Sequence, residues 1–211
     1  MKISVVIEAL ENGDRKGLNL IIQELLDNGI PAYEIVNDNL IAAMNDIGKR
    51  FRENILFVPE VLIAARAMNS AFEYLAPLLG NGKFSYKGKI LLGTVKDDLH
   101  DIGKNLVKLM FKSSGFEVID LGIDVPMEKF IDGVKDHSPD ILAMSALLTN
   151  TLPQMEIVLE GLKEHGLRDK VRVMVGGAPV SQEFADEIGA DGFAPDAASA
   201  VEMAKSLLSI N

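Results

Sequence analysis

Apolar residues in the first 80 or so positions recur at helical spacing. Leu18, Ile22 and Leu25 lie at positions i, i+4 and i+7, and Ile21 and Leu26 widen the same stripe. Two further stripes of this kind follow, at Val36, Leu40, Met44, Ile47 and Phe51 and then at Val61, Ala65, Met68, Phe72 and Leu75. Together with a weaker segment at the start of the chain, these stripes predict a small four-helix bundle.

The spacing changes after residue 82. The segment Gly80–Lys83 (GNGK) predicts a break in the chain. Beyond it, helical patterns of about 10–15 residues separate short apolar runs, as in repeated βαβ units. The runs cover residues 89–95, 116–121, 140–145, 171–175 and 191–194. We predict an α + α/β fold with a helical cap domain over residues 1–82. Over residues 88–211 we predict a flavodoxin-like (Rossmann-like) five-stranded parallel sheet with helices on both faces.

Composition narrows the function classes. The 211 residues include no cysteine, which excludes thiolate-bound zinc, iron–sulfur clusters and a thiol nucleophile. The formal net charge of −10 argues against a nucleic-acid partner. No apolar run reaches the roughly 18 residues of a membrane span, and the start lacks the pattern of a signal peptide. We therefore expect a soluble cytoplasmic protein.

Three segments that follow predicted strands carry the candidate chemistry. They are residues 97–105 (DDLHDIGKN), 145–149 (SALLT) and 176–179 (GGAP), after the first, third and fourth strands. Ligands of doubly wound folds bind beyond the carboxyl ends of the strands, so the three segments are expected to converge on one site.

Residue types in these segments suit a ligating histidine. His100 can bind a metal, Asp98 can accept the other ring N–H, and Gly103 lets a bulky group approach the backbone. A loop histidine beside helix-capping acids is an equally open interpretation of the same residues. Ser145 and Thr149 can likewise contact a ligand or cap the following helix.

The joint pattern resembles a known fingerprint. The spacings D-x-H-x-x-G from Asp98, S-x-L from Ser145 and G-G from Gly176 are similar to the cobalamin-binding motif. Cobalamin-dependent methionine synthase, the cobalamin-dependent mutases and the small corrinoid proteins share that motif. Residues 47–68 and 188–197 also resemble the cap and closing segments of the methyl-transferring members. The likeness is greatest to corrinoid proteins that serve methylamine, methanol or methoxyl methyltransferases. Asp97 stands where many relatives have glycine, so it must tolerate any left-handed backbone there.

The resemblance implies a site and a mechanism. Cobalamin would bind with its own base displaced and His100 as lower axial ligand to cobalt, while Asp98 and Ser145 extend a hydrogen-bonded relay from the imidazole. The chain would carry a methyl group from a substrate-specific methyltransferase to an acceptor methyltransferase, with a reductive activation protein as third partner. Met44, Phe57, Val58 and Met68 are candidates for shielding the upper face of the cofactor. The implied cofactor contacts are Asp98, His100, Asp101, Ile102, Gly103, Ser145, Leu147, Thr149, Gly176 and Gly177.

Other functions remain open at this stage. A subunit of an adenosylcobalamin mutase shares the three motifs but usually lacks the helical cap. A cobalamin sensor or storage protein would share both domains, although no basic stripe or spare length indicates DNA binding. A zinc enzyme would need carboxylate ligands, because His137 and His165 lie near predicted helix ends, where a capping or solvated histidine is expected.

Overall fold

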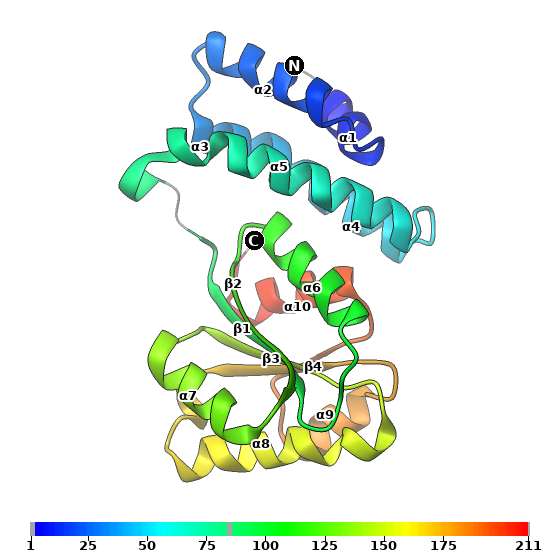
Figure 1. Ribbon diagram of the computed structural model, residues 1–211, viewed down its shortest axis with the longest axis vertical. Helices are drawn as coiled ribbons and strands as arrows, with labels where there is room; N and C mark the ends of the chain where they lie inside the picture. The colour runs from blue at the N-terminus through cyan, green and yellow to red at the C-terminus, as the bar shows by residue number, and fades with distance from the viewer. Residues whose placement is uncertain (1–2, 84–85, 211) are drawn as a thin grey trace. The chain divides into compact units, whose positions relative to one another are not determined.

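The computed structural model describes residues 3–83 and 86–210. The chain divides into two compact units (Figure 1). The first comprises the described residues up to Tyr86 together with Lys112–Gly115, and the second comprises Lys87–Phe111 and the described residues from Phe116 onward.

The first unit is a bundle of four helical segments. They are α1 (Ile3–Glu11), α2 (Arg15–Asp27), a composite segment and α5 (Val58–Lys83). The composite segment joins α3 (Ala32–Glu34), the π-helical η1 (Ile35–Ile41) and α4 (Ala42–Arg52) without a break. The apolar stripes of these helices meet inside the bundle. The fully buried side chains of the bundle include Leu10, Leu18, Ile22, Ile35, Leu40, Met44, Ile47, Met68 and Leu75. The predicted bundle is confirmed.

Local signals place most helix ends of this unit. Asp14 caps α2 by accepting the Gly17 N–H at 2.9 Å, and Gly29 leaves the helix at φ +80°. Pro59 is the second residue of α5, where its missing N–H is not needed. The predicted break at Gly80–Lys83 is wrong, because α5 continues to Lys83. Glycine lowers helix propensity by only about 1 kcal/mol, so two glycines need not end a long helix.

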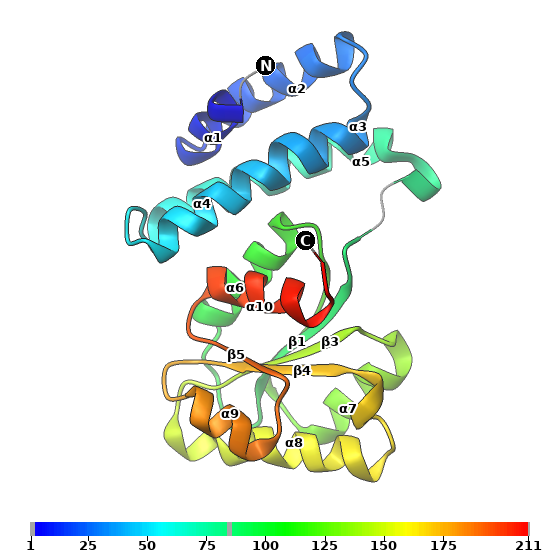
Figure 2. The same ribbon diagram turned by 180° about the vertical axis from the view of Figure 1, so that it is seen from behind.

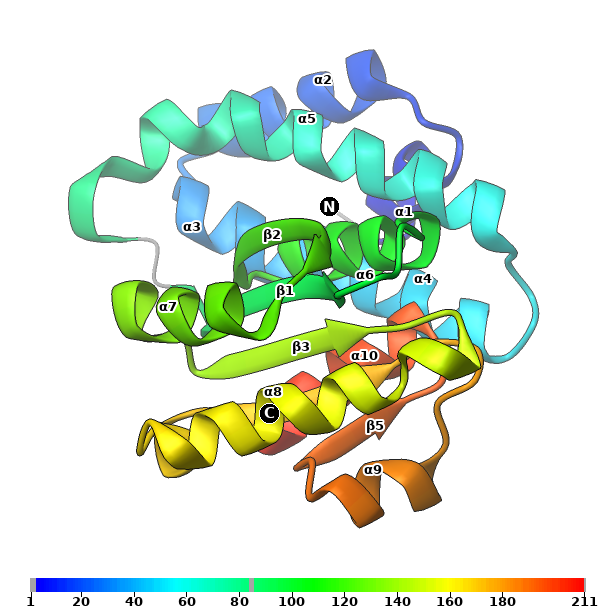
Figure 3. The same cartoon turned by 60° about the horizontal axis from the view of Figure 1, so that its bottom comes forward.

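The second unit is a doubly wound parallel sheet. Its strands are β1 (Lys89–Val95), β2 (Glu117–Val125), β3 (Ile141–Ser145), β4 (Arg172–Gly176) and β5 (Gly192–Ala194), in the order β2-β1-β3-β4-β5. All four strand pairings are parallel, and the arrows of β1, β3 and β5 run the same way in Figure 3. The predicted sheet is confirmed.

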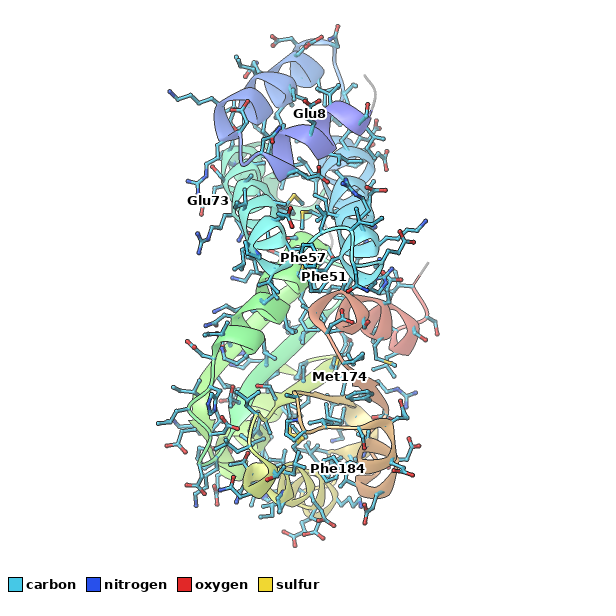
Figure 4. The ribbon with its side chains drawn as sticks, turned by 90° about the vertical axis from the view of Figure 1, so that its right-hand side faces the viewer. Glu8, Phe51, Phe57, Glu73, Met174 and Phe184 are labelled. Carbon is cyan, nitrogen blue, oxygen red and sulfur yellow. The ribbon has the colours of Figure 1, made fainter. Side chains whose placement is uncertain are left out.

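Helices cover both faces of this sheet. Figures 1 and 2 show α6 (Ile102–Ser113) and α10 (Ala197–Leu207) on one face. The other face carries α7 (Met127–His137), α8 (Pro153–Glu164) and α9 (Gln182–Ile188). Phe184 of α9 packs against the apolar core beneath this face (Figure 4). Two 3-10 turns, η2 (Thr149–Thr151) and η3 (Arg168–Lys170), flank α8.

The carboxyl end of β2 departs from regular pairing. β2 runs four residues beyond its predicted end, and its register with β1 shifts twice, after Leu92 and after Gly93. Gly122 (φ +91°) and Asp124 (φ +51°) have left-handed backbones in this stretch. Such bulges bend a strand and redirect its end, here beside the loop that follows β1.

Within the described ranges, none of the helices combines the length and the apolar character that a membrane span requires.

Candidate cofactor site

The loop between β1 and α6, residues 96–101, presents the imidazole of His100. We call this segment the His100 loop. The side chain of His100 is 49% exposed, and its Nδ1 lies 2.7 Å from Asp98 Oδ1. Because Nδ1 is engaged by the carboxylate, Nε2 is the ring nitrogen available to a metal.

Asp98 is the centre of the hydrogen-bond network. It is fully buried, and its Oδ1 accepts both the His100 ring and the His100 backbone N–H, the latter at 3.0 Å. Its Oδ2 accepts the backbone N–H groups of Leu147 (2.7 Å) and Leu148 (3.3 Å) and the Thr151 hydroxyl (3.0 Å). Burial raises the pKa of Asp98, but these donors outweigh it and lower that pKa to about 2. The carboxylate is therefore a fixed anion, and it orients the imidazole through Nδ1.

The hydroxyl beside Asp98 is that of Thr151, where the sequence analysis expected Ser145. Thr94 donates its hydroxyl proton to the His100 carbonyl at 3.0 Å, so Ser145 donates to Thr94 across 2.9 Å. Ser145 thus supports the His100 backbone through Thr94. Thr149 is exposed, while η2 turns Thr151 inward, where it is 1% exposed. Threonines at both positions were visible in the sequence, but the pattern did not distinguish the inward one.

Apolar side chains surround the histidine without being buried. Leu99 is 69% exposed, Ile102 80%, Leu147 44% and Leu148 39%. All four lie on the two segments that Asp98 joins, the His100 loop with the start of α6 and the loop after β3. Such a cluster of exposed apolar residues beside a ligating group suits a large, flat, partly apolar ligand. Asp101 lies outside this apolar group and accepts the side-chain amide of Asn105 at 2.9 Å.

The motif glycines Gly103, Gly176 and Gly177 have different structural roles. A Cβ at Gly103 would meet nothing within 4 Å, so this position borders open space near His100. A Cβ at Gly176 would lie 2.9 Å from the Ala194 carbonyl oxygen. At Gly177, where φ is +132°, it would lie 1.8 Å from the Ala146 carbonyl oxygen. Gly103 fits the expected approach of a bulky group, whereas Gly176 and Gly177 let neighbouring strand ends come close.

Asp97 adopts the left-handed backbone that glycine would take, at φ +65°. Its N–H donates to Asp124 Oδ1 at 2.8 Å. Aspartate is among the few residues that adopt this conformation at modest cost, because its short polar side chain can bond locally. The departure from glycine at this position is therefore compatible with the loop.

The described residues contain no group of three or more histidine, aspartate or glutamate side chains able to hold a metal ion. His165 instead donates its Nδ1–H to the Gly161 carbonyl oxygen, 2.8 Å away, at the end of α8. A metal held by His100 would thus have one protein ligand. This arrangement fits a metal that arrives with its own equatorial macrocycle and does not fit a protein-built zinc site.

Comparisons with known proteins agree with this chemistry. Residues 88–203 and 4–76 match two family models, each described as a B12 binding domain. The chain is 48% identical to dimethylamine corrinoid protein 1 of Methanosarcina acetivorans, over 83% of each chain. A cobalamin-binding protein from Desulfitobacterium hafniense has a similar structure, at 32% identity, TM-score 0.83 and 98% coverage of both chains. So does the methanol:cobalamin methyltransferase complex of Methanosarcina barkeri, at 28% identity, TM-score 0.86 and coverage of 98% of this chain and 79% of that one. The chain therefore belongs to the family of corrinoid proteins with B12 binding domains, and cobalamin is its cofactor.

Proposed function

We propose that this protein carries a methyl group on cobalamin between two methyltransferases, with His100 as the lower ligand of the cobalt. The observation that supports it most is the exposed His100 imidazole held at Nδ1 by the buried Asp98 carboxylate. Relatives named as a dimethylamine corrinoid protein and as a methanol:cobalamin methyltransferase complex support the carrier role. A match to a B12 binding model over residues 4–76 favours methyl transfer over a mutase subunit, which usually lacks the helical domain.

Bound cobalamin supplies the cobalt on which a methyl group is placed and from which it is removed. His100 would hold the cobalt through Nε2, because its Nδ1 is bonded to Asp98. The Asp98 carboxylate, whose pKa is about 2, stays ionised and holds the orientation of the imidazole through Nδ1.

The remaining residues of the site have supporting roles in this proposal. Leu147 and Leu148 hold Asp98 through their N–H groups and offer apolar side chains to the cofactor. Gly103 leaves room for the ring or its displaced tail. Ser145 acts through Thr94 on the His100 carbonyl, so it is a positioning residue.

In the helical unit, the four shielding candidates differ in exposure. Met44 and Met68 are 1% and 0% exposed and belong to the core, whereas Phe57 is 61% and Val58 39% exposed (Phe57 is labelled in Figure 4). Of the four, only Phe57 and Val58 present their side chains at the surface of this unit.

Three partner proteins follow from this role: a methyltransferase that takes the methyl group from the substrate, one that passes it to an acceptor, and a protein that reactivates oxidised cobalt. We propose a methylamine as the methyl source, since the dimethylamine relative is 48% identical and the methanol system 28% identical.

The test is reconstitution with hydroxocobalamin followed by visible spectroscopy. We expect one cofactor per chain and a spectrum in which histidine replaces the cofactor's own base, with this signature lost in His100→Ala. His165→Ala, which removes a capping histidine of α8, serves as the matched control and should keep the signature. An unchanged spectrum in His100→Ala would show that His100 is not the ligand. Absence of binding to the unmodified protein would refute the proposed function.

A further inference from the structure

Asp124, near the end of β2, is joined to the His100 loop by two hydrogen bonds. Its Oδ1 accepts the Asp97 N–H at 2.8 Å, and its own N–H donates to the Asp98 carbonyl oxygen at 3.0 Å. We call this pair of hydrogen bonds the clasp. Asp97 and Asp124 both have left-handed backbones, with φ of +65° and +51°. Non-glycine residues in this region are uncommon, and they persist where the surrounding structure holds them.

We infer that Asp124 is a positioning residue for the cobalt ligand. The carboxylate of Asp98 is held by donors from the segment after β3, namely the Leu147 and Leu148 N–H groups and the Thr151 hydroxyl. Those bonds fix where the carboxylate lies, whereas the Asp98 backbone is held separately, on one side by its own N–H to the Val95 carbonyl at 3.2 Å. Asp124 holds that backbone from the opposite side, on β2.

The imidazole depends on both attachments. His100 lies two residues beyond Asp98 and takes its direction from the 2.7 Å bond between Nδ1 and Asp98 Oδ1. Its backbone is also held, through its N–H to Asp98 Oδ1 (3.0 Å) and through its carbonyl oxygen, which accepts the Thr94 hydroxyl (3.0 Å). If the Asp97–Asp98 backbone shifts, the carboxylate can stay bonded to Leu147 while the imidazole turns away from the productive direction. A displacement of about 1 Å is enough to spoil a metal–ligand geometry.

The bulges of β2 account for the reach of Asp124. The register of β2 against β1 shifts twice before Val95 pairs with Val125, and Gly122 turns at φ +91°. Because of this bend, Asp124 faces the His100 loop. A regular edge strand would instead run straight past that loop. Extra residues at a bulge that re-aim a side chain are common beside functional sites.

A series of substitutions at Asp124 separates the acceptor oxygen of its side chain from its tolerance for a left-handed backbone. Asp124→Asn keeps the acceptor oxygen and the tolerance for a left-handed backbone. Asp124→Gly keeps the backbone and loses the acceptor, and Asp124→Ala loses both. Ser138→Ala is the matched control, because Ser138 also has a left-handed backbone (φ +45°) but ends α7, before β3 begins.

The first measurement uses the protein without cofactor. Amide hydrogen exchange by NMR should show that the Asp97 N–H exchanges roughly tenfold faster in the Gly and Ala variants than in the Asn variant, as expected for the loss of one hydrogen bond. Ser138→Ala should leave this amide unchanged. Equal protection of the Asp97 amide in all variants would overturn the inference.

The second measurement uses the protein reconstituted with hydroxocobalamin, and it rests on the proposed function of His100. The Asn variant should keep the visible signature of histidine ligation, whereas the Gly and Ala variants should bind cofactor with a reduced histidine-ligated fraction. A full signature in Asp124→Ala, or an equal loss in Asp124→Asn, would refute the positioning role. If the unmodified protein binds no cobalamin, the proposed function fails, and the exchange of the Asp97 amide still decides whether the clasp exists.

Discussion

Gly177 offers the sharpest test of how the strand ends are packed. A Cβ added there would lie 1.8 Å from the Ala146 carbonyl oxygen, on a backbone with φ of +132°. Relieving that overlap to an ordinary contact near 3.4 Å needs about 1.6 Å of movement between the ends of β3 and β4. Backbone strain costs about 1–3 kcal/mol and an overpacked contact a similar amount, so we expect Gly177→Ala to destabilise the sheet unit by about 2–6 kcal/mol.

The same movement would reach the cofactor site. Ala146 directly precedes Leu147, whose N–H donates to Asp98 at 2.7 Å. A shift of roughly 1 Å would break a bond of this length, because hydrogen bonds weaken steeply beyond their normal distances. Gly177→Ala should therefore weaken cobalamin binding even at temperatures where the variant remains folded.

Gly166→Ala is the matched control. Gly166 has φ of +64°, but a Cβ there would meet nothing within 4 Å, so the substitution adds left-handed strain of about 1–2 kcal/mol without a clash. Urea unfolding would be followed through NMR amide signals of β3 and β4, and cofactor affinity through visible titration. Equal stability and equal affinity of the two variants would show that close approach of these backbones is not what Gly177 provides.

Three further predictions test other parts of the molecule. Burial raises the pKa of Asp120, but bonds from two lysine ammonium groups and the Gly122 N–H lower it to about 2. This depressed pKa contributes stability above the ordinary value of 3.8, up to roughly 2 kcal/mol, which is lost as pH falls from about 4 toward 2. Asp120→Asn should remove that pH dependence in urea unfolding, and an unchanged acid profile would contradict this account. Thr151→Val should lower the free energy of unfolding by about 1.5–3 kcal/mol, because it removes a hydroxyl donor to the buried Asp98 carboxylate. Thr151→Ser keeps a hydroxyl and should lower it less. Equal unfolding midpoints of the two variants would count against the bond between Thr151 and Asp98. Met44→Ala, at 1% exposure, should destabilise the helical unit by about 2–5 kcal/mol, and Phe57→Ala, at 61%, by no more than about 0.5. Thermal unfolding of both variants checks the contrast, and similar losses would mean that Phe57 is part of the core.

The ion pairs around Asp120 connect the start of α6 with β2. Lys104, whose side chain is 3% exposed, lies 2.7 Å from Asp120 Oδ1 and 2.9 Å from Oδ2, and Lys108 lies 2.7 Å from Oδ2. A buried ammonium needs such a partner, since an unpaired charge in this position would be strongly destabilising. The helix that begins directly after the His100 loop is thereby anchored to the same strand that carries Asp124.

Much of this protein could be predicted from its sequence. Helical stripes and short apolar runs are local patterns, and burial of one face enforces them, so the four-helix bundle and all five strands were expected near their observed positions. The D-x-H-x-x-G motif of Asp98, His100 and Gly103 could be read from the sequence, because the three residues lie within six consecutive positions. The helical continuation through Gly80–Lys83 was not, since propensity is a weak constraint that packing and neighbouring turns override.

The tertiary structure alone decided which distant groups meet. Parallel strands have no hairpin to set their register, so the sequence could not show that Thr94 pairs with Ser145, which draws the serine hydroxyl away from Asp98. The inward turn of Thr151 depends on η2, and the need for Gly177 depends on a carbonyl more than 30 positions earlier in the chain. The bond from the Asp97 N–H to Asp124 on β2 likewise joins residues that lie 27 positions apart in the chain. Residue types and spacing thus determined the chemistry available at the site. Strand register and backbone contact determined which of those groups act on the histidine, because both are set by packing between segments that lie far apart in sequence.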